Sequence, residues 1–267
     1  MEEFGDVVRS LEDLVKSELS GWPAEWEGFH WPGYTYEHTL RVRNLSLSMA
    51  RQLGADEGLV ELAALLHDIG KPEGEPHGDA GARRAEAVLL ELGISADSHS
   101  RVSHMIRTHV APDPAYPIEN LVLSDADFID ANFGYVAFTR YITIRASRAH
   151  TVGEMIAGAG DWLLRSDGKR EKVITDLGHV IARERLGRMH SFLVSLREDL
   201  LSKTDGKGPA IGIARYLTAD ARLPSLFCQV EQMESVLHGG CAVNGLQPSV
   251  FLREFVRMLK EEIAGGR

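Results

Sequence analysis

The stretch Leu65-Leu66-His67-Asp68-Ile69-Gly70-Lys71 is the one around which we expect the fold to be organised. It completes a run of good helix formers, Leu59 to Leu66. Gly70 and Pro72 are expected to stop that helix, because glycine accepts a left-handed cap and proline cannot continue the hydrogen-bond ladder. An imidazole and a carboxylate therefore lie side by side at the end of an apolar helix, where they would be buried. Burying such a pair is costly unless a partner compensates, and a divalent metal is the usual partner.

The overall composition is that of a soluble globular protein, with 44% hydrophobic and 25% charged residues among 267. A formal net charge of -10 argues against binding extended nucleic acid or anionic membranes and slightly favours small substrates. The two cysteines, Cys228 and Cys241, form neither a metal-binding spacing nor a disulfide framework, which is typical of a reducing compartment. No signal peptide and no apolar run of membrane length is apparent. We therefore expect a cytoplasmic protein with no membrane partner.

The N-terminal residues are predicted to pack on the core. Apolar positions at three-to-four spacing indicate an amphipathic helix over residues 2–20. Residues 21–34 contain two prolines and several glycines and are predicted to form an ordered loop. The aromatic side chains of this loop are expected to serve packing rather than base stacking, namely Trp22, Trp26 and Trp31.

A second histidine faces the core on the next helix, which is predicted from about residue 36 to 53. His38 shares one face of that helix with apolar residues at spacings of 4, 7 and 11, namely Val42, Leu45 and Met49. An inward histidine taken alone is more often a hydrogen-bonded core residue than a ligand. His38 gains interest only because His67 offers a second inward imidazole.

Further along the chain, helical geometry separates three histidines between residues 98 and 110. His109 has apolar residues three, four and seven positions behind it, so it is expected to face inward. His104 has polar neighbours and is expected to face water, and His99, near the helix start, is a weaker candidate. His104 and His109, five residues apart, point about 140° away from each other on a helix and do not easily share one metal. His77 lies in a loop, where it is either a ligand or an exposed histidine.

The run from residue 121 to 130 places three acids inside an apolar helical pattern, where at least one needs a cationic partner. Periodicity does not choose between Asp125 and Asp127. The helical pattern continues to residue 149 and carries Arg140 and Arg145. These arginines either bind phosphate oxygens in a bidentate manner or pair with local acids and solvent.

The chain after His150 remains helical in pattern and contains no recognisable catalytic set. Helices are expected at about 152–166, 171–202, 209–218, 225–237 and 248–263, with joints at Asp205-Gly206-Lys207-Gly208 and Gly239-Gly240. No glycine loop for nucleotides, nucleophile elbow or internal repeat is found. We predict an all-α fold with three parts: an N-terminal helix and Trp-rich loop at 1–33, a metal-binding core at 34–150 and a C-terminal helical extension at 151–267. The pattern is compatible with a homodimer, but no decisive interface stripe is visible.

The inward candidates together form a set of nitrogen and oxygen donors without thiolates. They are His38, His67, Asp68, His77, His109 and an acid at 125–127. Such donors suit Mn, Fe, Co, Ni, Zn or, with water completing the coordination, Mg. Six protein ligands exceed what one catalytic metal needs, because such a metal must keep an open position. Two metals that share a bridging carboxylate would use all six, and Asp68 is the natural bridge.

Three motifs follow one another in this core: Tyr36-Glu37-His38-Thr39-Leu40-Arg41-Val42, then His67-Asp68-Ile69-Gly70-Lys71, then Asp125-Ala126-Asp127. This order resembles the HD superfamily of metal-dependent phosphohydrolases. The intervals of 29 residues between the first two histidines and 59 between the two acids fall in that family's usual range. The resemblance implies an HD-domain helical bundle in which Asp127 is the ligand. His77 and His109 resemble the extra histidines of the family's dinuclear branch.

The resemblance also implies hydrolysis of a phosphoester or phosphoanhydride in a nucleotide or another small phosphorylated metabolite. One or two divalent metals would lower the pKa of a bound water from 15.7 to about 7. Asp68 would then be both ligand and catalytic residue, and Asp125 would orient a ligand or accept a proton. Lys71 is the first candidate for a phosphate contact, unless it only caps a helix C-terminus. Arg140 and Arg145 are further candidates for substrate binding.

Two other functions compete with hydrolysis. Some dinuclear HD proteins resemble this set but hold a mixed-valence di-iron centre and cleave C–C or C–P bonds with oxygen. Consumption of oxygen and inactivity toward phosphoesters would indicate that chemistry. A non-catalytic nucleotide-binding sensor is the third hypothesis, although a pure binding module has no need of a complete ligand set.

Overall fold

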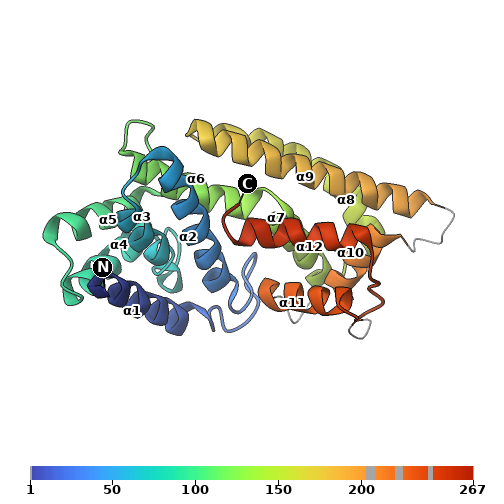
Figure 1. The fold of residues 1–267 in the computed structure, drawn as a ribbon, viewed down its shortest axis with the longest axis horizontal. Coiled ribbons are helices and arrows are strands. Elements are labelled where there is room, and N and C mark those ends of the chain that lie inside the picture. The colour runs from blue at the N-terminus through green and yellow to red at the C-terminus, as the bar shows by residue number, and fades with distance from the viewer. Residues whose placement is uncertain (1, 203–207, 220–224, 240–242, 267) are drawn as a thin grey trace. The chain divides into compact units, whose positions relative to one another are not determined.

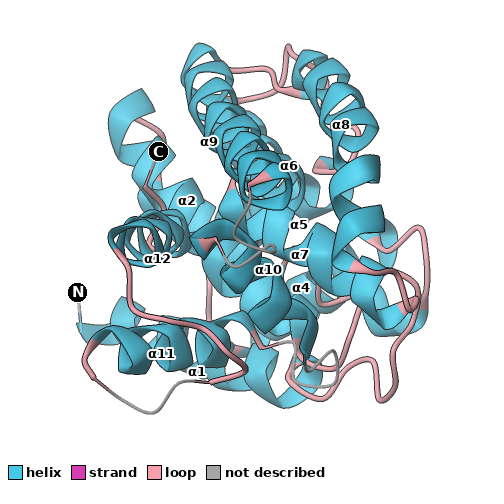
Figure 2. Cartoon of the chain, turned by 90° about the vertical axis from the view of Figure 1, so that its right-hand side faces the viewer, coloured by secondary structure: helices cyan, strands magenta, loops and turns pink. Residues whose placement is uncertain are grey.

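The computed structural model describes residues 2–202, 208–219, 225–239 and 243–266, without the side chains of residues 2 and 3. Within these ranges the regular elements are helices, so the predicted all-α class is confirmed (Figure 1, Figure 2). None of the described helices is long and apolar enough to cross a membrane. Residues 205–207 and 240 of the two expected joints, and Cys241, lie outside the described ranges.

The chain forms two compact units. The first contains the residues up to Ile129 together with Val173–Gly178, and the second contains Asp130–Lys172 and His179–Gly265. The segment 1–33 and most of the predicted core thus belong to the first unit. The division into three parts made from the sequence stays a prediction.

The first unit is a bundle of helices around an apolar core. Its elements are α1 (Glu2–Leu19), α2 (Tyr34–Leu53), α3 (Glu57–Leu66), the short 3-10 helix η1 (Lys71–Glu73), α4 (Gly78–Glu91), α5 (Ala96–Thr108) and α6 (Ile118–Asn132), the last of which continues into the second unit. Side-chain caps begin two of these helices: Asp56 accepts from the N–H of Leu59 and Ser95 from that of Ser98. The apolar stripe predicted for α2 is buried, with Val42, Leu45 and Met49 at most 1% exposed.

The chain after α3 differs from the expectation in how the helix ends. Helix α3 stops at Leu66 with His67 as its C-cap, and Gly70 has φ −83° and ψ −13°, a right-handed conformation. The predicted left-handed cap at Gly70 is therefore wrong. This glycine is needed for space: a Cβ there would lie 2.5 Å from the carbonyl oxygen of His77 and 2.8 Å from the Cα of Gly81. The absence of a side chain lets the start of α4 pack directly against the His-Asp turn.

Replacement of Gly70 by alanine is expected to destabilise the protein by roughly 1–3 kcal/mol, because the added methyl group meets backbone on two sides. The displaced backbone belongs to His77, so bound metal should also fall. Chemical denaturation and elemental analysis measure the two effects. Gly21→Ala is the matched control, because a Cβ at Gly21 meets nothing within 4 Å. Equal stability and metal content in Gly70→Ala and Gly21→Ala would contradict this account.

Asp125 ties a distant segment into the first unit. Its buried carboxylate accepts hydrogen bonds from the backbone N–H groups of Ile174 and Thr175, both at 2.8 Å, and from the Thr175 hydroxyl at 2.7 Å. These contacts explain why Val173–Gly178 belongs to this unit. They favour an anchoring role for Asp125 over the catalytic role expected from the sequence.

An Asp125→Asn variant is expected to lose roughly 1–3 kcal/mol of unfolding free energy and to keep its metal. The amide offers one acceptor oxygen where the carboxylate offers two, so buried donors of the 173–178 segment lose their partner. Urea denaturation and metal analysis test this, with the exposed Asp97→Asn as the control. Unchanged stability combined with lost turnover would instead support the catalytic role.

The second unit is a separate helical assembly. Its elements are α7 (Tyr135–Ser147), α8 (Val152–Lys169), the 3-10 helix η2 (Arg170–Lys172), most of α9 (Asp176–Leu201), α10 (Pro209–Ala219), α11 (Leu226–Leu237) and α12 (Val250–Ile263). Its core contains four buried aromatic rings that contact one another, mostly edge-on or tilted: Tyr135, Phe138, Phe192 and Phe255. The fully buried Glu262 accepts from the N–H of Val136 and pairs with Arg188. The long helix expected from residue 171 begins at Asp176, after η2.

Candidate metal centre

Five separate segments of the first unit bring the six ligand candidates together. The residues are His38 on α2, His67 and Asp68 after α3, His77 before α4, His109 after α5, and Asp127 on α6. The four imidazoles and Asp68 are at most 5% exposed, whereas the Asp127 side chain is 22% exposed. The cluster is therefore buried on most sides and reaches solvent beside Asp127.

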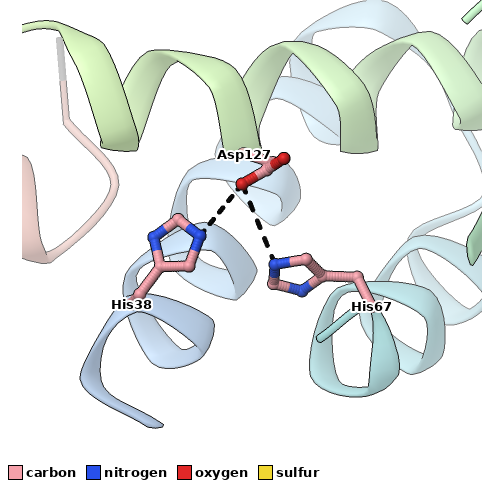
Figure 3. A group of neighbouring side chains, drawn as sticks. All are labelled: His38, His67 and Asp127. Carbon is pink, nitrogen blue, oxygen red and sulfur yellow. Dashed lines mark hydrogen bonds and ion pairs between the residues drawn. The ribbon is translucent and has the colours of Figure 1, made fainter. Parts of the chain in front are cut away.

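The ligand atoms form two neighbouring groups of three. The first consists of His38, His67 and Asp127, and within it every ligand atom lies within 4.8 Å of the others. Figure 3 shows the two imidazoles and the carboxylate converging from three helices. The second group, within the same limit, consists of Asp68, His77 and His109. We call them the first and second group below.

The carboxylate of Asp68 faces both groups at once. Its Oδ2 lies 3.4 Å from His67 Nε2 and 3.8 Å from His38 Nε2, whereas its Oδ1 lies 3.1 Å from His77 Nε2. Asp127 is placed similarly, with Oδ1 2.9 Å from His38 Nε2 and Oδ2 3.9 Å from His109 Nε2. An oxygen turned to each side is the arrangement that a bridging carboxylate requires.

Hydrogen bonds orient three of the imidazole rings. His67 and His109 each follow the last turn of a helix, and each Nδ1 donates to the carbonyl oxygen three residues earlier, at 2.8 and 2.6 Å. Such carbonyls have no partner within the helix, so the ring satisfies them. His77 donates instead from Nδ1 to a carboxylate oxygen of Glu75 at 2.7 Å. With the proton on Nδ1, each Nε2 presents a lone pair to the cluster.

The donor set fits a divalent cation. His77 Nε2 and His109 Nε2 lie 3.3 Å apart, and two lone pairs facing each other at that distance need a proton or a cation between them. Two nitrogens at about 2.0–2.1 Å from a tetrahedral ion are separated by roughly this distance. His67 Nε2 is buried and has no hydrogen-bond partner among the described residues. Buried polar atoms are rarely left unpaired, so this nitrogen also indicates a ligand.

Burial and neighbouring charge keep these groups in the protonation states that metal binding needs. Burial lowers the pKa of His67 to about 4, which leaves its imidazole neutral. Burial alone would raise the pKa of Asp68, but the surrounding imidazoles and the Lys71 ammonium hold it well below its usual range. Burial alone would lower the pKa of Lys71, yet the carboxylates of Asp68 and Asp127 raise it. The centre thus holds ionised carboxylates, a neutral His67 and a protonated lysine.

The metal-free protein is expected to lose stability as pH falls from 6.5 toward 4. Over this range unfolded His67 binds a proton that the folded side chain, with its pKa near 4, does not take up. Unfolding therefore takes up a proton, and the lowered pKa costs on the order of 3 kcal/mol at the acid end. Urea denaturation of chelator-treated protein across this range measures the loss. A His67→Gln variant with the same pH dependence as wild type would contradict the assignment.

The region containing this centre matches a known domain family. Residues 35–132 match the HD domain, and that range encloses both groups of ligand candidates. The chain contains an HD domain. The HD domain thus accounts for most of the first unit, and the helices of the second unit follow it along the chain.

Relatives of this HD domain fall into two kinds. A deoxyguanosinetriphosphate triphosphohydrolase-like protein of Bradyrhizobium diazoefficiens is 48% identical over 56 residues, which span 21% of this chain and only 13% of that relative. The Bacillus subtilis protein YpgQ is 25% identical over 176 residues, 63% of this chain and 85% of its own. The crystal structure of YpgQ in complex with ADP gives a TM-score of 0.54 at 25% identity and covers 73% of this chain and 98% of that one. An HD-superfamily hydrolase from Bacillus thuringiensis is similar in fold, with a TM-score of 0.58 at 20% identity, covering 75% of this chain and 100% of its own.

The remaining predicted site residues lie at different places. Lys71 Nζ contacts Asp68 Oδ2 at 2.5 Å, so it lies at the edge of the centre. Arg140 and Arg145 are on α7 in the second unit, where Arg145 contacts His150 and lies over the Tyr141 ring. A role for either arginine in substrate binding stays a prediction.

Two neighbours of the HD-domain centre were not predicted from the sequence. Glu75 orients His77, and the Tyr34 ring stacks on His38 at a centroid distance of 5.8 Å with 7° between the planes. The position of Glu75, two residues before a loop histidine, was a usable signal, because a carboxylate there can reach the ring. Tyr34 lies one helical turn before His38, so the α2 pattern contained that contact as well.

Proposed function

We propose that this HD domain is a metal-dependent phosphohydrolase that acts on a nucleotide or another small phosphorylated metabolite. The observation that carries the proposal is the pair of three-residue groups with one oxygen of Asp68 turned to each. Such a set suits hydrolysis by metal-activated water, in which attacking and leaving oxygens need positive charge nearby. The bond cleaved would be a phosphoester or a phosphoanhydride.

In this proposal a bound divalent metal supplies a water of pKa about 7 and positive charge for the phosphoryl oxygens. The protein supplies the rest. The fixed Nδ1 hydrogen bonds hold the Nε2 lone pairs of His67 and His109 in place before substrate arrives. The buried surroundings strengthen every charge interaction, because little water screens them. The protonated Lys71, 11% exposed and in contact with Asp68, would offer its positive charge to a phosphate oxygen.

The comparisons support a nucleotide as the substrate class. YpgQ, which covers most of this chain, was crystallised with ADP. Two relatives that are 48% and 50% identical over 56 residues are described as deoxyguanosinetriphosphate triphosphohydrolase-like, although the match spans only 13% of each. The net charge of -10 further supports a small substrate that enters a local positive site over a polyanion bound along the surface.

The proposal is tested by assaying the metal-reloaded protein against a set of phosphorylated substrates. Protein purified without chelator is analysed for metals, reloaded with Mn, Fe, Co, Ni, Zn or Mg, and offered nucleoside mono-, di- and triphosphates beside simple phosphoesters. Release of phosphate or pyrophosphate that requires metal would support the proposal. Oxygen uptake by the iron form without phosphate release would support the oxygenase instead. Tight ADP binding with no turnover in any metal form would support a sensor.

A further inference from the structure

The imidazoles of His67, His109 and His77 differ in the acceptor to which each Nδ1 donates. His67 and His109 use carbonyl oxygens at the ends of the preceding helices. His77 has no such oxygen, because it precedes α4 and follows the loop after η1. In place of a helix end it has the carboxylate of Glu75, whose Oε2 lies 2.7 Å from Nδ1 and 3.3 Å from the backbone nitrogen of His77.

This carboxylate reaches the buried centre from the surface. The Glu75 side chain is 64% exposed, whereas that of His77 is 6% exposed. On its other side the His77 ring faces Asp68 Oδ1 at 3.1 Å and His109 Nε2 at 3.3 Å. Rotation of this one ring would therefore remove a nitrogen from the second group while leaving the first group intact. The loop carries no other hydrogen bond to the ring among the described residues.

We propose that Glu75 is a positioning residue that sets the affinity of the second group for a divalent cation without contacting the cation. A carboxylate acceptor both fixes the ring and makes its free nitrogen a stronger donor, and loss of such a partner typically costs 10- to 100-fold in metal affinity. The inference rests on the proposed function, since it requires the second group to bind metal. Beyond that function, it assigns to Glu75 a selective effect on the affinity of the second group, with none on the first.

Cobalt titration at one fixed pH tests the inference, because bound cobalt can be followed by visible absorption as well as by elemental analysis. Three variants are compared with wild type. Glu75→Ala removes the acceptor, and Glu75→Gln keeps an acceptor oxygen but removes the charge. Glu73→Gln is the matched control, because Glu73 lies two residues earlier at the end of η1, is 48% exposed and has its carboxylate 3.8 Å from the Arg84 guanidinium.

We expect the second cobalt to bind about 10- to 100-fold more weakly in Glu75→Ala, with an intermediate loss in Glu75→Gln and none in Glu73→Gln. The first cobalt should bind as in wild type in all three. Equal affinity for the second ion in Glu75→Ala and wild type would overturn the inference. So would parallel loss of both ions, which indicates a general structural defect. If Glu75→Ala does not fold, the comparison of Glu75→Gln with Glu73→Gln decides.

Failure of this inference and failure of the proposed function give different results. A wild type that binds one cobalt and still hydrolyses a nucleotide would remove the role of Glu75 and leave the phosphohydrolase standing. If wild type binds two ions, Glu75→Ala weakens the second, and no phosphate compound is hydrolysed, the role of Glu75 would stand and the phosphohydrolase would be refuted.

Discussion

Replacement of Asp68 by asparagine is expected to abolish turnover and to deplete the protein of metal. Asp68 is fully buried between the two groups, with Oδ2 3.4 Å from His67 Nε2 and Oδ1 3.1 Å from His77 Nε2, so its loss weakens both positions. The amide is neutral, which also leaves the Lys71 ammonium, 2.5 Å away, without its partner. A metal contributes several kcal/mol to catalysis, and each 1.36 kcal/mol is tenfold in rate. We therefore expect kcat/KM to fall by about 10³-fold or more.

The measurement pairs steady-state kinetics with elemental analysis of the same preparation. Asp97→Asn makes the same chemical change at a side chain that is 83% exposed, and it should leave both quantities unchanged. Full metal content with full turnover in Asp68→Asn would refute the bridging role. Full metal content with lost turnover would assign Asp68 to catalysis and remove it from the ligands.

The double variant His77→Ala, His109→Ala is expected to bind about one metal where wild type binds about two. These residues contribute two of the three ligands of the second group and none of the first, so one position is emptied selectively. Turnover should drop by at least about tenfold if both ions act on the phosphoryl group. Metal per chain, counted by elemental analysis, is the primary readout.

The matched control is His99→Ala with His104→Ala, which removes two histidines from the helix that precedes His109. Neither belongs to a ligand group, and His104 instead contacts the Tyr116 ring. About one metal in wild type and in both double variants would mean that the second group is not a metal site. The HD domain would then be mononuclear, with His38, His67, Asp68 and Asp127 as its ligands.

Helical periodicity explains why so much of this centre could be predicted. An inward histidine on a helix has apolar residues at fixed spacings, which is how His38 and His109 were separated from His104. The structure buries the first two and leaves His104 half-buried beside Tyr116. The choice of Asp127 over Asp125 needed the resemblance to HD proteins, because both acids lie on the same apolar run. In the structure Asp125 accepts a hydrogen bond from the backbone of Thr175, whereas Asp127 contacts His38 in the centre.

The features that could not be predicted depend on contacts between distant segments. Nothing local in the sequence shows that Asp125 binds the backbone at Thr175, fifty residues away. Gly70 follows a helix, as a capping glycine would, yet it is the close approach of α4 that excludes a side chain there. Short-range patterns describe one helix at a time, whereas these roles arise only once helices have met.

The ligand candidates of this centre come from five segments spread over residues 38 to 127, and this spacing would couple metal binding to folding. An unfolded chain has no preformed site, because closing loops of that length around one ion is entropically expensive. An ion held by these residues would therefore bind the native state and stabilise it by mass action, by about 4 kcal/mol at a free concentration a thousand times the Kd. In a cell short of the metal, the protein would lose its resistance to proteolysis together with its activity. Its abundance would then follow the metal supply.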